Sequence, residues 1–383
     1  MSAAGHAAPA EAAPRGTGDT ATGDTRAAGP LLEVRDLHVR FRQRGADVLA
    51  VNGVDYTAWP GRTLAIVGES GSGKTVSARA VMGLLPGNAA VTGSARLRGE
   101  ELLVLSEPEM RAHRGADIAM IFQDPARSLN PTMRVGAQIT EAIRSHRQLS
   151  RRAARERAVE LMGRVRLPMP ERRFVEYPHQ LSGGMRQRVM IAIALACDPR
   201  LLIADEATTA LDVTTQAQIM ELLLDLQAEF GMAIIMITHD LGLAACYADE
   251  VTVMYAGRVV ERASAAELFG WPAAGGSAAR NRDDAEPAVP GRTGHGGGSG
   301  HVRMPYTKAL LDAVPRLDRP AHSPLPVVAG RPPDMSARLP GCPFEPRCSS
   351  ARDTCRSAAP PLSEHEPGHE WACWYPCGNG GSA

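Results

Sequence analysis

The sequence predicts an α/β fold with a mostly parallel sheet, and three apolar runs support this prediction. Residues 63–67, 201–204 and 232–237 are short and aliphatic, as buried strands are. The last two each follow a segment with helical periodicity, and alternating strands and helices are typical of a parallel sheet covered by helices. Two further β-rich runs, 31–34 and 37–41, mark the start of the folded region.

The composition excludes several classes of protein. The 383 residues include 42 Lys plus Arg and 42 Asp plus Glu, so the formal net charge is zero. This balance lacks the basic footprint of a general nucleic-acid binder, and we expect no nucleic-acid partner. No apolar run approaches the roughly 18 residues that span a bilayer. Because the first thirty residues also lack the apolar core of a secretory signal, we expect a cytoplasmic chain that does not cross a membrane by itself.

Changes in composition divide the chain into four parts. Residues 1–30 are rich in Ala, Gly and Thr and predict a disordered tail. Residues 31–270 carry the strand and helix pattern, with a helical subdomain inserted at about 131–188. Residues 271–302 are rich in Ala, Gly, Pro and charged residues and predict a flexible linker. Residues 303–383 are rich in proline and hold five of the seven cysteines, so we expect a small, separately organised extension.

A phosphate-binding loop is the clearest motif. Residues 68–75 read Gly-Glu-Ser-Gly-Ser-Gly-Lys-Thr, which fits G-x-x-x-x-G-K-[ST] between a predicted strand and a predicted helix. Glycines let backbone N–H groups turn toward phosphate oxygens, and Thr75 offers a hydroxyl to Mg²⁺. Lys74 is one of only two lysines in this arginine-rich chain, and its compact ammonium enters a phosphate cradle that a guanidinium is too broad for. We predict that the ATP phosphates are bound by Gly68, Ser70, Gly71, Ser72, Gly73, Lys74 and Thr75.

Two acids follow the strand predicted at 201–204. Asp205 is placed to hold Mg²⁺, and Glu206 is placed to polarise a water. Alone, such a pair is often structural. After a P-loop, it is most simply the second half of an ATP site.

A second anion-binding device lies at 181–184, which read Leu-Ser-Gly-Gly before the apolar helical run 189–197. A serine and two glycines at a helix N-terminus present free N–H groups to an anion. The two devices need not act on the same nucleotide within one subunit. Together with the preceding motifs, they resemble the ATP-binding subunits of the ABC transporter superfamily, and the resemblance covers residues 31–270.

The resemblance implies a P-loop ABC ATPase fold and a role for individual residues. ATP would lie between the P-loop of one subunit and Ser182, Gly183 and Gly184 of the other. Glu206 would be the general base, His239 would contact the γ-phosphate, and Mg²⁺ would be held through Thr75, Gln123 and Asp205. The remaining implied contacts are Asp212 across the dimer interface and Phe41 stacked on adenine, where tyrosine is more usual.

Further motifs resemble the peptide importer ATPases of the oligopeptide, dipeptide and nickel type. They are the glutamate in the P-loop, Phe-Gln-Asp-Pro at 122–125, Ser-Leu-Asn-Pro at 128–131, Tyr-Pro-His-Gln at 177–180, Pro-Tyr-Thr at 305–307 and Cys-Pro-Phe-Glu-Pro-Arg-Cys at 342–348. Two features depart from that group. Met304 stands where histidine is usual, and 271–302 has the character of an insertion.

This resemblance implies an ATPase subunit that energises import of dipeptides or oligopeptides, peripheral on the cytoplasmic face of the cell membrane. The implied partners are two transmembrane permease subunits, a sibling ATPase subunit or a second copy of this chain, and indirectly an extracytoplasmic solute-binding protein. An importer of nickel or another solute remains an alternative. A soluble ABC ATPase usually has two cassettes or a long coiled-coil insertion, neither of which is present. The peptide-type C-terminus argues against an exporter.

Four cysteines, Cys342, Cys348, Cys355 and Cys373, form a cluster in the sequence, and Cys377 is spare. Thiols in a cytoplasmic protein are seldom in disulfides. The close cysteine pairs of zinc sites are missing, which argues mildly against zinc. The four positions resemble the ligands of a [4Fe–4S] cluster in the peptide importer group, so the resemblance implies an iron–sulfur centre. Zinc and unliganded thiols are the alternatives.

Overall fold

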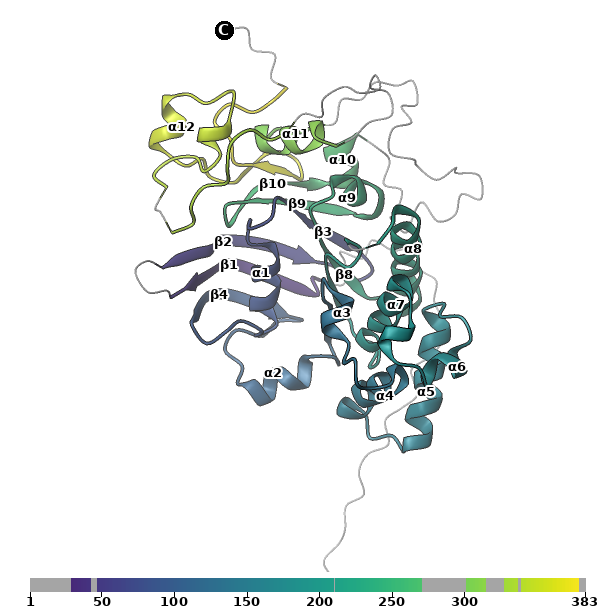
Figure 1. Ribbon diagram of the computed structural model, residues 1–383. Helices are drawn as coiled ribbons and strands as arrows, with labels where there is room; N and C mark the ends of the chain where they lie inside the picture. Colours follow the sequence, from purple (N-terminus) through teal and green to yellow (C-terminus); the bar gives the residue numbers. More distant parts are fainter. Residues whose placement is uncertain are drawn as a thin grey trace, which may run out of the picture.

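The structure is a computed structural model, and it describes residues 29–42, 47–209, 211–270, 301–314, 327–336 and 339–378 (Figure 1). The predicted N-terminal tail and the predicted 271–302 linker lie almost wholly outside these residues. No helix of the described part is long and apolar enough to cross a membrane.

The first strands form an antiparallel sheet of their own. Its order is β2 (Val48–Ala58), β1 (Leu32–Phe41), β4 (Ala89–Leu97) and β5 (Glu100–Glu101). The runs predicted at 31–34 and 37–41 are therefore one long strand, which pairs with β2 on one side and β4 on the other.

A larger sheet of eight strands is the centre of the fold. Its order is β11 (Ser363–Glu366), β12 (His369–Trp371), β10 (Arg258–Ser264), β9 (Glu250–Tyr255), β3 (Thr63–Val67), β8 (Ala233–Thr238), β7 (Leu201–Asp205) and β6 (Ile118–Ile121). Neighbours from β9 to β6 are parallel, and those from β9 to β11 are antiparallel. The predicted α/β class is confirmed, and the prediction of a mostly parallel sheet holds only for the strands from β9 to β6, because the fold has one antiparallel and one mixed sheet. Short connections explain the difference, because β9 and β10 are joined by a tight turn and such a turn can only reverse the chain.

The two faces of the large sheet are buried against different layers. Along β3 and β7, alternate residues belong to different cores, as the period of two requires. Leu64, Ile66, Leu201 and Ile203 pack toward the antiparallel sheet and α1 (Lys74–Val81), whereas Ala65, Val67, Leu202 and Ala204 pack toward the other helices.

Most helices cover the second face and one end of the sheet (Figure 1). The segment predicted as a helical subdomain, 131–188, contains α4 (Val135–His146), α5 (Arg151–Arg164) and α6 (Pro170–Phe174) and no strand, and all of it is described. Ser150 caps α5 by accepting a hydrogen bond from the Ala153 amide at 3.2 Å. The remaining helices are α2 (Glu107–His113), α3 (Pro125–Ser128), α7 (Gly183–Ala194), α8 (Val213–Phe230), α9 (Leu241–Tyr247), α10 (Ala265–Phe269), α11 (Pro305–Asp312) and α12 (Asp353–Ser357).

The described C-terminal segment is not the separately organised unit that the sequence suggested. Its strand β12 pairs with β10, placing Trp371 opposite Glu261, so the segment extends the large sheet. Met304, Tyr306 and Phe344 are buried in the same core as the helices. The segment is too poor in apolar residues to form a core alone, and it therefore buries its aromatic side chains against the rest of the chain.

Candidate ATP site

Four adjacent parallel strands bring the predicted catalytic and phosphate-binding residues to one edge of the large sheet. The P-loop follows β3, His239 follows β8, Asp205 ends β7, and Gln123 comes two residues after β6. The carboxyl ends of parallel strands meet at the same edge, where ligands of open α/β sheets bind. This topology explains why residues far apart in the sequence share one site.

The P-loop needs its glycines because the chain passes close to neighbouring backbone. Gly68 and Gly73 have φ angles of 151° and 99°. A Cβ on Gly68 would lie 2.2 Å from the Met254 carbonyl oxygen, and one on Gly73 would lie 2.5 Å from that of Ala50. Only glycine fits either position without moving the backbone.

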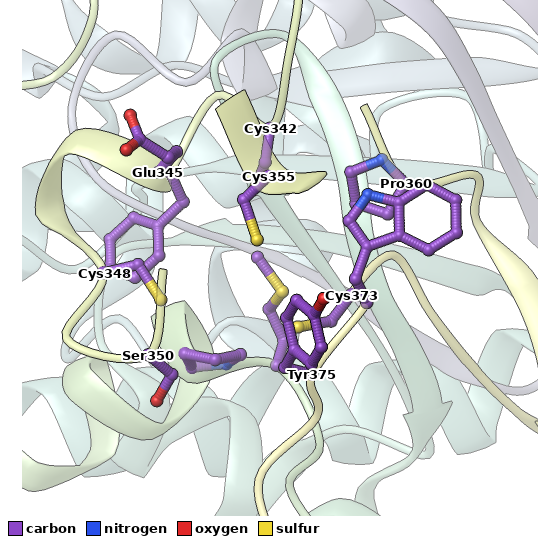
Figure 2. A pocket seen from close by; sticks show the side chains of 12 residues that line it. Cys342, Glu345, Cys348, Ser350, Cys355, Pro360, Cys373 and Tyr375 are labelled. Carbon is purple, nitrogen blue, oxygen red and sulfur yellow. The ribbon is translucent and has the colours of Figure 1, made fainter. Parts of the chain in front are cut away.

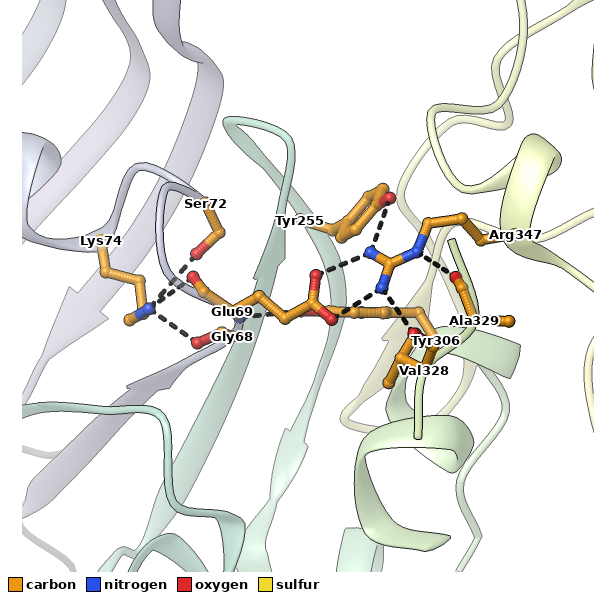
Figure 3. A network of polar contacts seen from close by, with 9 residues as sticks. All are labelled: Gly68, Glu69, Ser72, Lys74, Tyr255, Tyr306, Val328, Ala329 and Arg347. Atoms are coloured by element: carbon orange, nitrogen blue, oxygen red, sulfur yellow. Dashed lines mark hydrogen bonds and ion pairs between the residues drawn. The ribbon is translucent and has the colours of Figure 1, made fainter. Parts of the chain in front are cut away.

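Lys74 lies beneath the loop and is only 4% exposed. Its Nζ donates to the carbonyl oxygens of Gly68 at 2.7 Å and Glu69 at 2.9 Å, and it lies 3.4 Å from Ser72 Oγ (Figure 3). Burial lowers the pKa of Lys74, although the nearby Glu206 and Asp205 carboxylates act in the opposite direction. A phosphate bound at the loop would supply a negative charge that favours the charged form of Lys74.

Of the three residues expected to hold Mg²⁺, Thr75 and Asp205 are in direct contact, whereas Gln123 donates to Glu206. Thr75 Oγ1 donates to Asp205 Oδ1 at 2.7 Å. Asp205 is 1% exposed, its Oδ2 has no hydrogen-bond partner, and the nearest cation is Arg79 at 3.8 Å. Burial raises the pKa of Asp205. A buried carboxylate oxygen without a partner beside a hydroxyl is the oxygen set that Mg²⁺ prefers, so these residues fit the ion.

Glu206 is held at the end of β7 by polar neighbours. Its φ of 48° is unusual for a residue with a side chain, and its amide donates to the Ile237 carbonyl oxygen at 3.0 Å. Oε2 accepts from Gln123 Nε2 at 2.7 Å and from Thr209 Oγ1 at 3.3 Å, and Oε1 lies 3.5 Å from His239 Nδ1. Strained backbone that aims a carboxylate from a strand end is a mark of a functional position. Thr209 was not singled out from the sequence.

The structure leaves Ser182, Gly183 and Gly184 apart from this cluster. They lie at the exposed start of α7, and Ser182 Oγ accepts from the Met185 amide of its own helix at 3.3 Å. In the described part of the chain, no hydrogen bond joins these three residues to the P-loop. Ser182 and Gly183 are exposed and Gly184 is half-buried, so the start of α7 lies at the surface of the subunit.

Asp212 and Phe41 occupy structural positions in this single chain. Asp212 is the N-cap of α8 and accepts from the amide and the hydroxyl of Thr215, which lowers its pKa. Phe41 ends β1 and is half-buried against the core between the two sheets. Neither position tests the contact with a partner subunit or with adenine.

The four clustered cysteines line one pocket, together with Phe344, Trp374 and Tyr375 among others (Figure 2). The Cys342 amide donates to the Cys355 carbonyl oxygen at 2.7 Å, which brings the two parts of the segment together. Cys342, Cys348, Cys355 and Cys373 are in no disulfide, and Cys377 does not line the pocket. Burial and the neighbouring sulfurs raise the pKa of Cys342 and Cys348, and raise that of Cys373 to about 12.

A second set of possible ligands lies nearby. Glu267, Glu366 and His369 have ligand atoms within 4.8 Å of one another. Among the described residues, no other group of three or more His, Cys, Asp or Glu side chains meets this limit, and the four cysteines therefore do not. The four thiols are therefore more widely spaced than the ligands of a preformed zinc site, in which sulfurs surround one ion.

Two polar contacts to the P-loop were not anticipated. Tyr306 Oη accepts from the Glu69 amide, and Arg347 pairs with the Glu69 carboxylate. Both residues belong to motifs noted in the sequence, but no local pattern links them to a loop more than two hundred residues earlier.

Comparisons with known proteins agree with this geometry. Residues 51–209 match the family model described as ABC transporter, and residues 300–355 match the one described as oligopeptide/dipeptide transporter, C-terminal region. The oligopeptide transport ATP-binding protein OppD of Escherichia coli (strain K12) is 48% identical over 350 residues, which cover 91% of this chain and 94% of that protein. The dipeptide transport ATP-binding protein DppD of Bacillus subtilis (strain 168) is 43% identical over 346 residues, covering 90% and 94%.

A solved structure shares the cassette. The dimer of the ATP-binding cassette MJ0796 in a post-hydrolysis state with ADP and Pi is 28% identical with a TM-score of 0.55, and the match covers 61% of this chain and 98% of that one. The resemblance seen in the motifs is thus confirmed over most of the sequence. On these grounds, the chain belongs to the ABC transporter ATP-binding proteins of the oligopeptide/dipeptide type.

Proposed function

We propose that this chain binds and hydrolyses ATP to energise an ABC importer of dipeptides or oligopeptides. The observation that carries the proposal is the convergence of P-loop, Asp205, Glu206, Gln123 and His239 on one edge of the large sheet. The names of the relatives and the match of 300–355 support the transport role.

The residues divide the chemistry among them. P-loop amides and Lys74 bind the ATP phosphates, and Thr75 and Asp205 hold Mg²⁺, which neutralises charge that develops during phosphoryl transfer. Glu206 accepts a proton from the attacking water. Gln123 and His239 contact Glu206 from two sides and so fix the direction of its carboxylate.

The site is completed by a second ATPase subunit in this proposal. The start of α7 supplies Ser182, Gly183 and Gly184 to the nucleotide of the partner, because a helix N-terminus binds anions and, among the described residues, these three make no hydrogen bond to their own P-loop. The partner is a sibling ATPase or a second copy. Asp212 lies across that interface, and Phe41 stacks on adenine.

The remaining assignments follow from membership of this group. The chain binds two transmembrane permease subunits at the cytoplasmic face of the membrane and depends indirectly on an extracytoplasmic solute-binding protein. Import of nickel or another solute is the second candidate, because the same group contains such importers.

We also propose that the cysteine-rich C-terminal extension holds a [4Fe–4S] cluster through Cys342, Cys348, Cys355 and Cys373. In support, the four thiols share one pocket and none is in a disulfide. The raised pKa values of Cys342, Cys348 and Cys373 reflect burial and mutual repulsion of thiolates, which bound iron would relieve. The centre would hold the segment together, since ligation stabilises the folded form.

Uptake by living cells tests the transport role. A strain that lacks the gene is given the wild-type chain or Lys74→Ala, and the uptake of a labelled oligopeptide and of nickel is measured. We expect the wild-type chain alone to restore peptide uptake and to co-purify from membranes with two multi-span proteins. Restored nickel uptake without peptide uptake would favour the second candidate, and a chain recovered without membrane partners would contradict a transport role.

A further inference from the structure

Glu69, the second residue of the P-loop, is held at three points (Figure 3). Its amide donates to Tyr306 Oη at 2.8 Å, and its carbonyl oxygen accepts from Lys74 Nζ at 2.9 Å. Its carboxylate forms a two-pronged ion pair with Arg347, with distances of 2.7 Å from Nη1 and 2.9 Å from Nη2. Two of these three contacts come from the C-terminal segment.

Arg347 is fixed independently of Glu69. Its side chain is 4% exposed, and each of the five N–H donors of its guanidinium has an acceptor. Nε donates to the Ala329 carbonyl oxygen at 2.7 Å, Nη2 to that of Val328 at 3.2 Å, and Nη1 to Tyr255 Oη at 3.2 Å. The hydrogen bond to Glu69 is the main cause of the raised pKa of Arg347, which stays charged at every accessible pH.

Tyr306 is fixed by an aromatic cluster. Its ring centroid lies 4.5 Å from that of Tyr255 and 5.3 Å from that of Phe344, and all three side chains are at most 3% exposed. Phe344 comes from the same short motif as Arg347. The two groups that contact Glu69 therefore belong to one packed unit, in which rotation of either side chain would break other contacts.

A loop rich in glycine needs such support. Gly68, Gly71 and Gly73 all adopt positive φ, and glycine gives a loop many alternative conformations. Ordering the loop only when ATP arrives would reduce affinity by the entropy that is lost. A buried ion pair adds little net stability, because desolvation offsets its attraction, but it does select one geometry.

We propose that the C-terminal segment is a clamp that positions the P-loop for ATP, with Arg347 and Tyr306 as its positioning residues and Glu69 as the point it holds. The clamp rests on the proposed function, since it acts through the affinity for ATP. It gives a reason for three peptide-importer motifs at once: the glutamate in the P-loop, the tyrosine at 306 and the arginine at 347. None of these residues contacts the catalytic Glu206 in the described part of the chain.

Equilibrium binding of Mg-ATP to the full-length chain tests the clamp in a double-mutant cycle. Glu69→Ala and Arg347→Ala should each weaken binding roughly tenfold, and the double variant should be no weaker than Arg347→Ala, because both remove one interaction. The affinity of Arg347→Lys for Mg-ATP should lie between those of the wild type and Arg347→Ala, because lysine keeps the charge and loses the two-pronged geometry. Arg356→Gln is the matched control: its exposed guanidinium pairs with Glu345 in the same segment and should leave affinity unchanged.

Two further measurements separate positioning from general stability. Amide hydrogen exchange should increase at residues 68–75 in Glu69→Ala and remain slow in β3 and β8. In the assembled transporter, the KM for ATP should rise while kcat at saturating ATP is retained. Glu69→Ala removes the contact from the loop side, so it decides the matter even where Arg347→Ala unfolds the C-terminal segment.

The outcomes distinguish the clamp from the proposed function. If the wild-type chain bound ATP no better than Lys74→Ala, the proposed function would be rejected. If the wild type binds ATP and Glu69→Ala binds it equally well with unchanged exchange, the clamp is wrong. Additive effects of the two single substitutions would also overturn it, because independent losses do not require a shared contact.

Discussion

Replacing Glu206 with Gln should stop ATP turnover without preventing ATP binding. In the structure, Glu206 Oε2 accepts hydrogen bonds from Gln123 at 2.7 Å and Thr209 at 3.3 Å. A glutamine has the same length and keeps one oxygen that can accept from both, so the site should retain its shape. Its amide cannot take up the proton that the attacking water must lose.

The loss of a positioned general base lowers kcat by about 10²- to 10⁴-fold. Affinity for ATP should be equal or higher, because the substitution removes a negative charge beside the phosphates. Binding and turnover therefore separate in Glu206→Gln, whereas Lys74→Ala loses both, because it removes the ammonium that contacts the loop beneath the phosphates.

Phosphate release by the assembled transporter and equilibrium binding of Mg-ATP measure the two quantities. Glu229→Gln is the matched control, because it makes the same chemical change on the outer end of α8, where Glu229 pairs with Arg164. Turnover in Glu206→Gln within a few-fold of the control would refute the assignment of the base. Loss of ATP binding in Glu206→Gln would instead show that the carboxylate is needed to build the site.

Three further outcomes are expected. Burial raises the pKa of Asp205, so Mg²⁺-dependent ATP binding should be lost on acidification at a higher pH than an ordinary aspartate would allow. Because burial destabilises the ionised carboxylate, Asp205→Asn should raise the unfolding temperature measured without Mg²⁺ by a few degrees and abolish Mg²⁺ binding. An unchanged affinity for Mg²⁺ would contradict the site. Gly73→Ala should abolish ATP binding because its Cβ would lie 2.5 Å from the Ala50 carbonyl oxygen, whereas Gly87→Ala, with open space around its Cβ, should bind normally; equal binding by both would reject the close approach. Anaerobically purified protein should be brown from the iron–sulfur cluster. Serine at Cys342, Cys348, Cys355 or Cys373 should remove the colour, whereas Cys377→Ser should not. Colourless protein with stoichiometric zinc would assign the site to zinc, and colourless protein without metal would show four unliganded thiols.

The catalytic half of the site could be predicted from the sequence because its information is local. Strands β7 and β8 contain apolar runs, and each run is followed within two residues by the polar residue that the strand presents, Asp205 and His239. Once the strands are taken as parallel, topology alone gathers those residues at one edge. The role expected of each of these residues then comes from the resemblance of the motifs to the ABC transporter family.

The arrangement of the remaining strands could not be predicted in the same way. The apolar pattern of β9 would be the same with a parallel or an antiparallel neighbour, because both faces of the strand are covered. Proline and cysteine made the C-terminal segment look independent, yet composition does not say which surface its apolar residues cover. Phe344 and Tyr306 are buried in the core of the helices, where both pack against Tyr255 of β9.

The contact between Glu69 and Arg347 shows why variable positions of a motif need the fold. The P-loop pattern leaves residue 69 free, because phosphate binding by the loop uses backbone amides, Lys74 and Thr75. A carboxylate beside a phosphate site is unfavourable unless a cation compensates for it. Arg347 supplies that charge from 278 residues later, and its remaining donors are accepted by Val328, Ala329 and Tyr255. A glutamate in the loop and an arginine between two cysteines are thus one feature, and a substitution at either should be judged by its effect on the other.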